Sequence, residues 1–137
     1  MPADASGVAE LMAGAGIAVS PAELACRLDA LRQEPGAALL ALEWGPPSGL
    51  IVLNWFRTLR NDHPVAQITA LLVGSKDRRR GVGRLLLKAG AQAARSAGCV
   101  EISLFGGAAK SGLREFGIAN GFEETGLCLV RSLRKRS

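Results

Sequence analysis

The chain has few of the residues that build metal centres and disulfide frameworks. Its 137 residues include one histidine, three cysteines and no tyrosine, and aromatic residues make up 4%. Cys26, Cys99 and Cys128 are widely spaced, odd in number and form no C-x-x-C pair. We therefore expect no metal site and no disulfide framework. This cysteine usage is typical of a reducing compartment, so we expect a cytoplasmic location.

Long apolar runs are also missing. No run approaches the roughly 18 residues that a membrane span needs. The N-terminus lacks the basic stretch followed by an apolar one that marks a signal peptide. We therefore expect no membrane partner. The composition, 48% hydrophobic and 21% charged, predicts a packed core, and the length suits one domain over residues 1–137.

Positive charge is concentrated in two short segments. The formal net charge is +5, with five basic residues and one acidic residue over 76–84 and four basic residues over 131–136. The remainder is mildly acidic, so the pattern indicates local anion sites more than a nucleic-acid groove. Residues 134–137 are expected to form a basic tail. Because no aromatic residue interleaves with that tail, nucleic acid is an unfavoured partner.

The residue pattern predicts the element order α-α-β-β-β-α-β-α-β. The second helix has the sharpest start, because Ser20 is an N-cap, Pro21 follows it and Glu23 completes a capping box. That helix should stop before Glu34-Pro35-Gly36. The other expected helices cover residues 5–15, 82–97 and 111–120. The expected strands cover residues 37–44, 49–58, 66–73, 99–105 and 122–133.

Three of these segments predict a right-handed βαβ unit, namely strand 66–73, helix 82–97 and strand 99–105. Strands 37–44 and 49–58 read as a hairpin. Strand 66–73 is apolar on both faces near its end and should lie inside a sheet. The apolar stripe of the long helix consists of Val82, Leu85, Leu86, Ala89 and Ala93.

The junction between the third strand and the long helix carries glycines and arginines. It reads Arg78-Arg79-Arg80-Gly81-Val82-Gly83. A helix N-terminus offers backbone amides without intrahelical partners and a partial positive charge. Together with the arginines, these groups predict a site for a phosphate-type ligand. A solvated charged turn is the alternative interpretation. Neither G-x-x-x-x-G-K-[ST] nor G-x-G-x-x-G occurs here.

In this context residues 78–83 resemble the signature [Q/R]-x-x-G-x-[G/A] of the GCN5-related N-acetyltransferase (GNAT) family. The resemblance covers roughly residues 36–133, including the pair Gly121-Phe122. It implies a mixed α/β, acyl-CoA N-acyltransferase fold, with a central mixed sheet that is splayed at the cofactor site and helices on both faces. The family's first strand should be missing, since residues 1–4 are too few to form it. A homodimer that covers the resulting sheet edge is a further expectation.

The resemblance also implies how acetyl-CoA, the acyl donor, is held. The backbone of residues 71–73 would pair with the pantetheine arm, and amides from 78–84 would hold the pyrophosphate. Lys110 and Ser111 stand where family members often place an asparagine near the cofactor arm. The full expected set is Leu71, Leu72, Val73, Arg78, Arg79, Arg80, Gly81, Val82, Gly83, Arg84, Lys110 and Ser111.

The implied reaction moves acetyl directly from acetyl-CoA to a primary amine in a ternary complex. The amine must first lose a proton, because a typical ammonium has a pKa near 10, and a general base does this. The family's acid tyrosine would fall at Gly117, and its strand glutamate would fall at Thr69 or Ala70. The remaining catalytic candidates are Glu43, His63, Ser103 and Ser111, with Glu101 as a further carboxylate. Glu43 and Glu101 also read as surface residues, His63 as a turn residue before Pro64, and Ser103 as part of an ordinary strand pattern.

Three functions stay open at this point. The first is an N-acetyltransferase that acts on a small or peptide amine. The second is a catalytically degenerate module that binds acetyl-CoA for regulation or scaffolding, which the missing tyrosine and glutamate favour. The third is a nucleic-acid binder that uses the two basic segments. Four hairpin residues could wall an acceptor cleft or belong to the core, namely Trp44, Asn54, Trp55 and Phe56.

Overall fold

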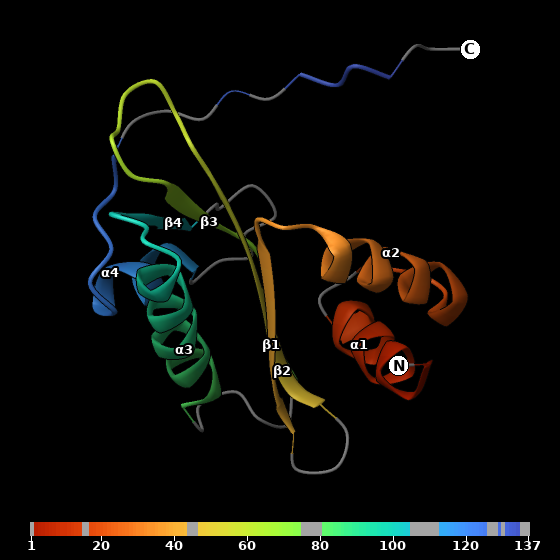
Figure 1. Cartoon of the computed structure of the whole chain (residues 1–137). Coiled ribbons are helices and arrows are strands. Elements are labelled where there is room, and N and C mark those ends of the chain that lie inside the picture. The colour runs from red at the N-terminus through yellow and green to blue at the C-terminus, as the bar shows by residue number, and fades with distance from the viewer. Residues whose placement is uncertain are drawn as a thin grey trace.

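The computed structural model of the chain describes residues 2–14, 17–43, 47–74, 81–104, 113–125, 129 and 131–134. Within these residues the elements follow the order α1-α2-β1-β2-β3-α3-β4-α4 (Figure 1), as predicted up to the short fourth helix. The helices are α1 (Pro2–Gly14), α2 (Pro21–Gln33), α3 (Val82–Ser96) and α4 (Leu113–Ala119). The strands are β1 (Ala37–Glu43), β2 (Pro47–Phe56), β3 (Val65–Val73) and β4 (Ile102–Leu104).

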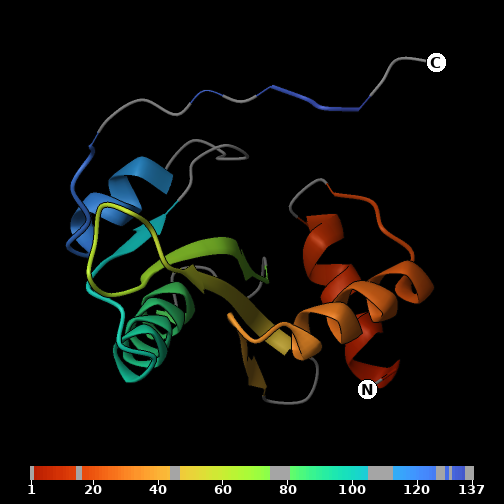
Figure 2. The same cartoon turned by 45° about the horizontal axis from the view of Figure 1, so that its top comes forward.

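The strands form one mixed sheet in the order β1-β2-β3-β4. β2 is antiparallel to β1 and to β3, and β4 is parallel to β3. α1 and α2 lie on one side of the sheet, and α3 and α4 lie on the other (Figures 1 and 2). The predicted mixed α/β class, with helices on both faces, is therefore confirmed.

Local sequence signals account for both ends of α2. The Ser20 hydroxyl accepts a hydrogen bond from the backbone amide of Glu23 at 3.2 Å, so one of the unpaired amides of the first turn is satisfied. At the other end Glu34 adopts an extended conformation, and its amide donates to the carbonyl of Leu31. The predicted N-cap is confirmed. The helix stops where proline follows, because proline cannot continue it.

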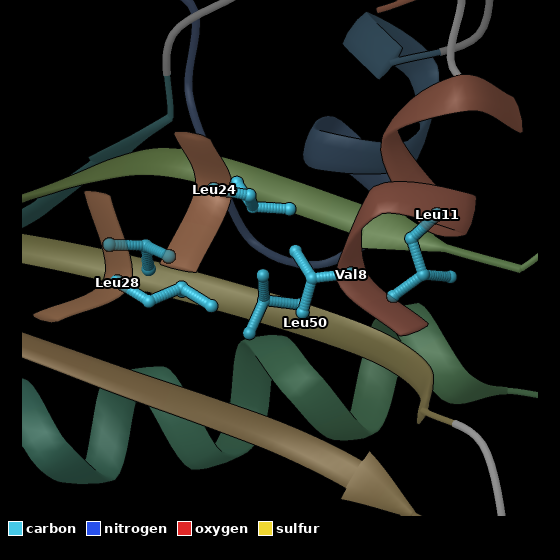
Figure 3. Close-up of a cluster of buried hydrophobic side chains, with 6 residues drawn as sticks. Val8, Leu11, Leu24, Leu28 and Leu50 are labelled. Carbon is cyan, nitrogen blue, oxygen red and sulfur yellow. The ribbon is translucent and has the colours of Figure 1, made fainter. Parts of the chain in front are cut away.

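The hydrophobic core has two parts, one on each side of the sheet. On the side of α1 and α2, helix residues pack on the first half of β2 (Figure 3). The residues of this part are Val8, Leu11, Leu24, Leu28, Leu50 and Val52. On the side of α3, the buried residues are Ile51, Leu53, Ile68, Val82, Leu86 and Leu87. Alternate residues of β2 thus serve opposite faces, as the pleat requires.

The buried stripe of α3 differs from the predicted one. The structure buries Val82, Leu86, Gly90 and Ala94, at intervals of four residues, whereas Leu85 is 50% exposed. Gly90 explains the rotation, since a Cβ atom there would lie 2.9 Å from Cδ1 of Ile51. The helix therefore packs on β2 along the line that contains this glycine, and the larger Leu85 turns outward.

Both ends of the chain differ from the prediction. α1 begins at Pro2, three residues before its predicted start. The predicted strand over 122–133 is wrong for the described part of that range, which has no strand. Phe122 packs against the core on the side of α3. Leu129 and Leu133, in contrast, are 84% and 89% exposed, and the blue end of the chain runs away from the helices and the sheet (Figures 1 and 2). An apolar pattern alone does not form a strand, because the backbone also needs a partner.

β4 is also shorter than the predicted strand 99–105. The residues before it form a turn in which the Val100 amide donates to the Pro64 carbonyl at 3.1 Å. Among the helices that the structure describes, none is long and apolar enough to cross a membrane.

Candidate functional site

Among the described residues, the sheet opens at the second half of β3. The described pairing of β3 with β4 joins residues 66–68 to residues 102–104. On its other side β3 stays paired with β2 up to Val73, which lies opposite Gly49. Within the described residues, positions 69–73 therefore have a neighbouring strand on one side only. Some of their backbone N–H and C=O groups point to the open side and can pair with an extended ligand.

α3 begins beside this opening. Gly81 is its N-cap, with φ = 79°, and no heavy atom of the described residues, its chain neighbours aside, lies within 4 Å of the place where a Cβ would stand. The first amide with a partner inside the helix is that of Leu85, which donates to the Gly81 carbonyl at 3.0 Å. The amides of residues 82–84 precede it and have no intrahelical acceptor. With the helix dipole, they can bind an anion such as a pyrophosphate.

The two glycines at this junction have different roles. Gly81 needs the left-handed conformation that glycine adopts most readily. A Cβ at Gly83, in contrast, would lie 3.1 Å from Cζ of Phe116 and 3.7 Å from Cγ2 of Val73. Gly83 belongs to the expected acetyl-CoA set, and in the structure its missing side chain makes room for Phe116 of α4 and Val73 of β3. These contacts place the start of α3 against the open half of β3.

The other predicted acetyl-CoA residues divide into two groups. Val82 is 4% exposed and belongs to the core on the side of α3, as expected, while Arg84 is exposed. Leu71 and Val73 pack at the edge of the same core, and Leu72 packs on the opposite side of the sheet. Arg78, Arg79, Arg80, Lys110 and Ser111 lie outside the described residues.

Gly117 occupies the position where the resemblance places a tyrosine. It is buried in α4, and a Cβ there would lie 3.3 Å from Cδ2 of Leu104 and 3.7 Å from Cβ of Phe122. Leu104 is the last residue of β4, so α4 lies close against the end of that strand. This packing explains why the smallest residue stands at position 117.

The structure separates most of the catalytic candidates from the open half of β3. Glu43 is the last residue of β1, opposite Pro47 and two strands away from the open side. His63 is exposed in the turn before β3, at the opposite end of that strand. Glu101 is exposed before β4, and its carbonyl accepts from the Ala66 amide at 2.9 Å. The fourth candidate, Ser111, lies outside the described residues.

Ser103 is the described candidate that lies nearest to the opening by register. It is exposed on β4 opposite Gln67, and its hydroxyl donates to the Ala66 carbonyl at 3.4 Å. Its strand neighbours Ile102 and Leu104 pack into the core on the side of α3. Ser103 therefore faces the side of the sheet that carries α1 and α2.

The structure also brings together two residues that sequence reasoning did not connect. β3 has one extra residue, because Val52 and Leu53 lie opposite Ala70 and Ile68 and leave Thr69 as a bulge. The Thr69 hydroxyl donates to Oδ1 of Asn54 at 2.7 Å. A weaker contact of 3.5 Å joins the same hydroxyl to the Val52 carbonyl. The polar residues were visible in two apolar strands, but a bulge cannot be read from their spacing.

Of the hairpin aromatics, Trp55 is half-buried and Phe56 is 45% exposed. The Trp55 amide donates to the Gly36 carbonyl at 2.8 Å. This bond extends the pairing of β2 with β1 to the residue just before β1. Trp44 lies outside the described residues.

The described residues contain no group of three or more His, Cys, Asp and Glu side chains that could hold a metal ion. Cys26 is exposed on α2. Burial raises the pKa of the Cys99 thiol, so Cys99 stays protonated and weakly nucleophilic near neutral pH.

Comparison with known proteins identifies the family of the chain. The sequence matches the Acetyltransferase (GNAT) family over residues 9–114, and the chain belongs to that family. No protein with a curated description matches it. The predicted acyl-CoA N-acyltransferase fold is thereby confirmed, and members of this family transfer acetyl groups from coenzyme A.

Solved structures show the same fold over nearly the whole chain. A candidate acetyltransferase from Arthrobacter sp. FB24 is 29% identical, with a TM-score of 0.78 over 97% of this chain and 92% of that one. Another from Agrobacterium tumefaciens is 25% identical, with a TM-score of 0.80 over 96% of each chain. The third, AAC(6')-Iy in complex with the bisubstrate analogue CoA-S-monomethyl-acetylneamine, is 18% identical, with a TM-score of 0.79 over 96% of this chain and 92% of that one.

Proposed function

We propose that this protein is an N-acetyltransferase that moves the acetyl group of acetyl-CoA to a primary amine by direct transfer in a ternary complex. The observation that carries the proposal is that the start of α3 lies against the half of β3 that has no described partner on the side of β4. An anion site and an open strand edge then lie side by side, as a ligand with a pyrophosphate and an amide-containing arm requires.

The start of α3 fits the pyrophosphate. The amides of residues 82–84 have no acceptor within the helix. Gly81, which precedes them, has no described side chain within 4 Å of its Cβ position. Exposed Arg84 adds positive charge. Arg78, Arg79 and Arg80 stay predictions for the same role, as do Lys110 and Ser111 for the cofactor arm.

The open half of β3 fits the pantetheine arm. Leu71, Leu72 and Val73 keep their antiparallel pairing with β2 on one side, so their backbone is held straight and their remaining polar groups face outward. The amide groups of the arm can pair with these groups as an added strand would.

Acetyl-CoA, when bound, supplies the acetyl group as a reactive thioester. The neutral amine nitrogen forms a bond to the acetyl carbon while the carbon–sulfur bond breaks, and one amine proton reaches the departing sulfur. Gly117 has no group that can donate a proton, so we assign the proton transfer to water. Because an ammonium of pKa near 10 must first lose a proton, kcat/KM should rise with pH up to the pKa of the acceptor.

The described cysteines favour direct transfer over an acetylated enzyme. Cys99 lies beyond the last turn of α3, and the 15 residues of this helix put it about 22 Å from the helix start. Its raised pKa also keeps it protonated. Cys26 lies on α2, on the other side of the sheet.

Calorimetry with acetyl-CoA, followed by steady-state release of coenzyme A with a panel of amines, tests the proposal. We expect binding of acetyl-CoA and turnover of at least one primary amine. Arg84→Ala should raise the KM for acetyl-CoA about threefold to fivefold, as the loss of one exposed charge contact implies. Arg134→Ala, which removes an equally exposed arginine from the C-terminal segment, is the matched control and should leave KM unchanged.

Two results would contradict the proposal in different ways. Binding of acetyl-CoA without turnover of any amine would indicate a binding module. No binding at all would show that the start of α3 and the end of β3 do not form an acetyl-CoA site.

A further inference from the structure

The side of the sheet that carries α1 and α2 is only half covered by these helices. Leu50, Val52, Ala70 and Leu72 pack against them. Beyond the bulge, the same side carries Asn54, Gln67, Thr69 and Ser103, which we call the polar row. Thr69 and Ser103 are exposed, and Asn54 and Gln67 are half-buried.

The register puts the polar row on one face. Asn54 lies opposite Gln67, and Gln67 lies opposite Ser103, and residues paired across a sheet share a face. Leu53, Ile68 and their neighbours on β4 point to the other face, where they pack under α3. The hydrogen bond between Thr69 and Asn54 places the bulge residue on the same face as Asn54.

The polar row also lies next to the reaction site proposed above. Thr69 is the first residue of β3 beyond the last pair with β4, and Leu71 follows two residues later on the same strand. A ligand held by Thr69 is therefore adjacent to the strand segment assigned to the cofactor arm.

The hydrogen bond inside the row determines which groups are left for a ligand. A hydroxyl has one proton and two lone pairs. The Thr69 proton is directed to Oδ1 of Asn54 at 2.7 Å, so the Thr69 oxygen can accept from an amine N–H. Asn54 uses its carbonyl oxygen in this bond, and its Nδ2 group has two protons that can be donated to a ligand oxygen. Gln67 and Ser103 extend the same neutral hydrogen-bonding surface.

From these observations we infer that the polar row is the acceptor-binding surface, and that the acceptor is a primary amine with hydroxyl groups on neighbouring carbons. This inference rests on the proposed function. Thr69 accepts a hydrogen bond from the amine, and Asn54 donates one to a hydroxyl oxygen. All four residues of the row are uncharged, so the selectivity for hydroxyl groups comes from hydrogen bonds and not from ion pairs.

The test compares 2-amino-1,3-propanediol with propan-2-amine, which has the same carbon skeleton without the hydroxyl groups. Rates are expressed per concentration of neutral amine, because the hydroxyl groups change the pKa of the amine. The unchanged protein should prefer the diol in kcat/KM by about tenfold, the value of one or two neutral hydrogen bonds. Asn54→Leu should bring this preference down to about onefold to twofold.

Thr69 has its own variants. Thr69→Val should lower kcat/KM for both amines about tenfold, because each amine loses the group that orients its nitrogen. Thr69→Ser keeps the hydroxyl and should stay within about threefold of the unchanged protein. The KM for acetyl-CoA should not move in any of these variants.

The chain offers a matched control pair. In the turn before β3, Nδ2 of Asn61 donates to the Thr58 hydroxyl at 3.1 Å. Asn61→Leu and Thr58→Val remove a comparable bond far from the opening and should leave the preference for the diol unchanged.

The outcomes separate the inference from the proposed function. If amines are acetylated but the preference for the diol is absent, or survives Asn54→Leu, the polar row is not the acceptor surface and the proposed function stands. If the control pair abolishes the preference equally, the effect is structural and the inference is wrong. If the unchanged protein acetylates neither these nor other amines, both are wrong.

Discussion

The covered and the uncovered half of one sheet face show how the same two strands can serve stability and binding. Toward one end, β2 and β3 present leucine, valine and alanine to α1 and α2 (Figure 3). From the Thr69 bulge to the other end, the same face carries the polar row, which α1 and α2 leave exposed or half-buried. The covered half gains free energy from burial. The uncovered half contributes little to stability, so its side chains are available for hydrogen bonds with a ligand.

The largest expected effect tests this contrast directly. Leu50 is 3% exposed in the covered half, and Leu50→Ala should lower the free energy of unfolding by about 2–5 kcal/mol. Gln67→Ala in the uncovered half of this face should change it by no more than about 0.5–1 kcal/mol. Urea unfolding of both variants measures the difference. Equal losses would mean that the uncovered half is part of the core.

Gly49 extends the comparison to the other face of the sheet, under α3. A Cβ at this position would lie 2.8 Å from Cδ1 of Leu86 and 3.0 Å from the Leu72 carbonyl oxygen. Gly49→Ala should therefore cost about 1–3 kcal/mol through overpacking. Gly83→Ala meets only the tip of Phe116, at 3.1 Å, and should cost less in the same unfolding experiment. The reverse order would contradict the packing described here.

Gly81 provides a smaller effect that reaches the site. It has φ = 79° with open space around the Cβ position, so Gly81→Ala should cost about 1–2 kcal/mol from backbone strain alone. Asparagine tolerates this conformation better, and Gly81→Asn should cost less. The Kd for acetyl-CoA, measured by calorimetry, should rise about fivefold in Gly81→Ala if the strain tilts the first amides of α3. An unchanged Kd would show that the conformation of Gly81 does not affect binding at the anion site.

The smallest effect concerns the thiol of Cys99, in the turn that follows α3. Burial raises the pKa of Cys99 above its ordinary value of 9.0, so the folded state binds this proton more tightly than the unfolded state. Stability should then fall slightly as the pH rises above about 9, and Cys99→Ser should remove this part of the decline. Alkylation followed by mass spectrometry should show exposed Cys26 modified before Cys99 at pH 8. Faster modification of Cys99 would contradict its assigned burial.

Much of the fold could be predicted because its signals are local. The Ser20 cap, the long helix after Gly81 and the hairpin of β1 and β2 follow from adjacent residues and regular periodicity. The family resemblance at residues 78–83 also led to the correct fold. The site was predicted less completely, since the pairing of Asn54 with Thr69 depends on a bulge and joins residues 15 positions apart.

The remaining differences have the same cause. Leu129 and Leu133 have the composition of a strand, but they lie exposed where the structure describes them. Gly83 has the sequence context of a loop that binds a ligand. In the structure its neighbour is Phe116 of α4, which is far away in sequence. In both cases the outcome depends on what the rest of the chain places beside the residue.

Residue order was thus enough to specify where most helices and strands form and where a helix begins with unpaired amides, because these properties arise from neighbours along the chain. Packing determined which stripe of α3 is buried, where the sheet opens and which polar side chains share a face. These features depend on contacts between segments far apart in sequence, and their free energy exists only when the whole sheet and its helices have come together.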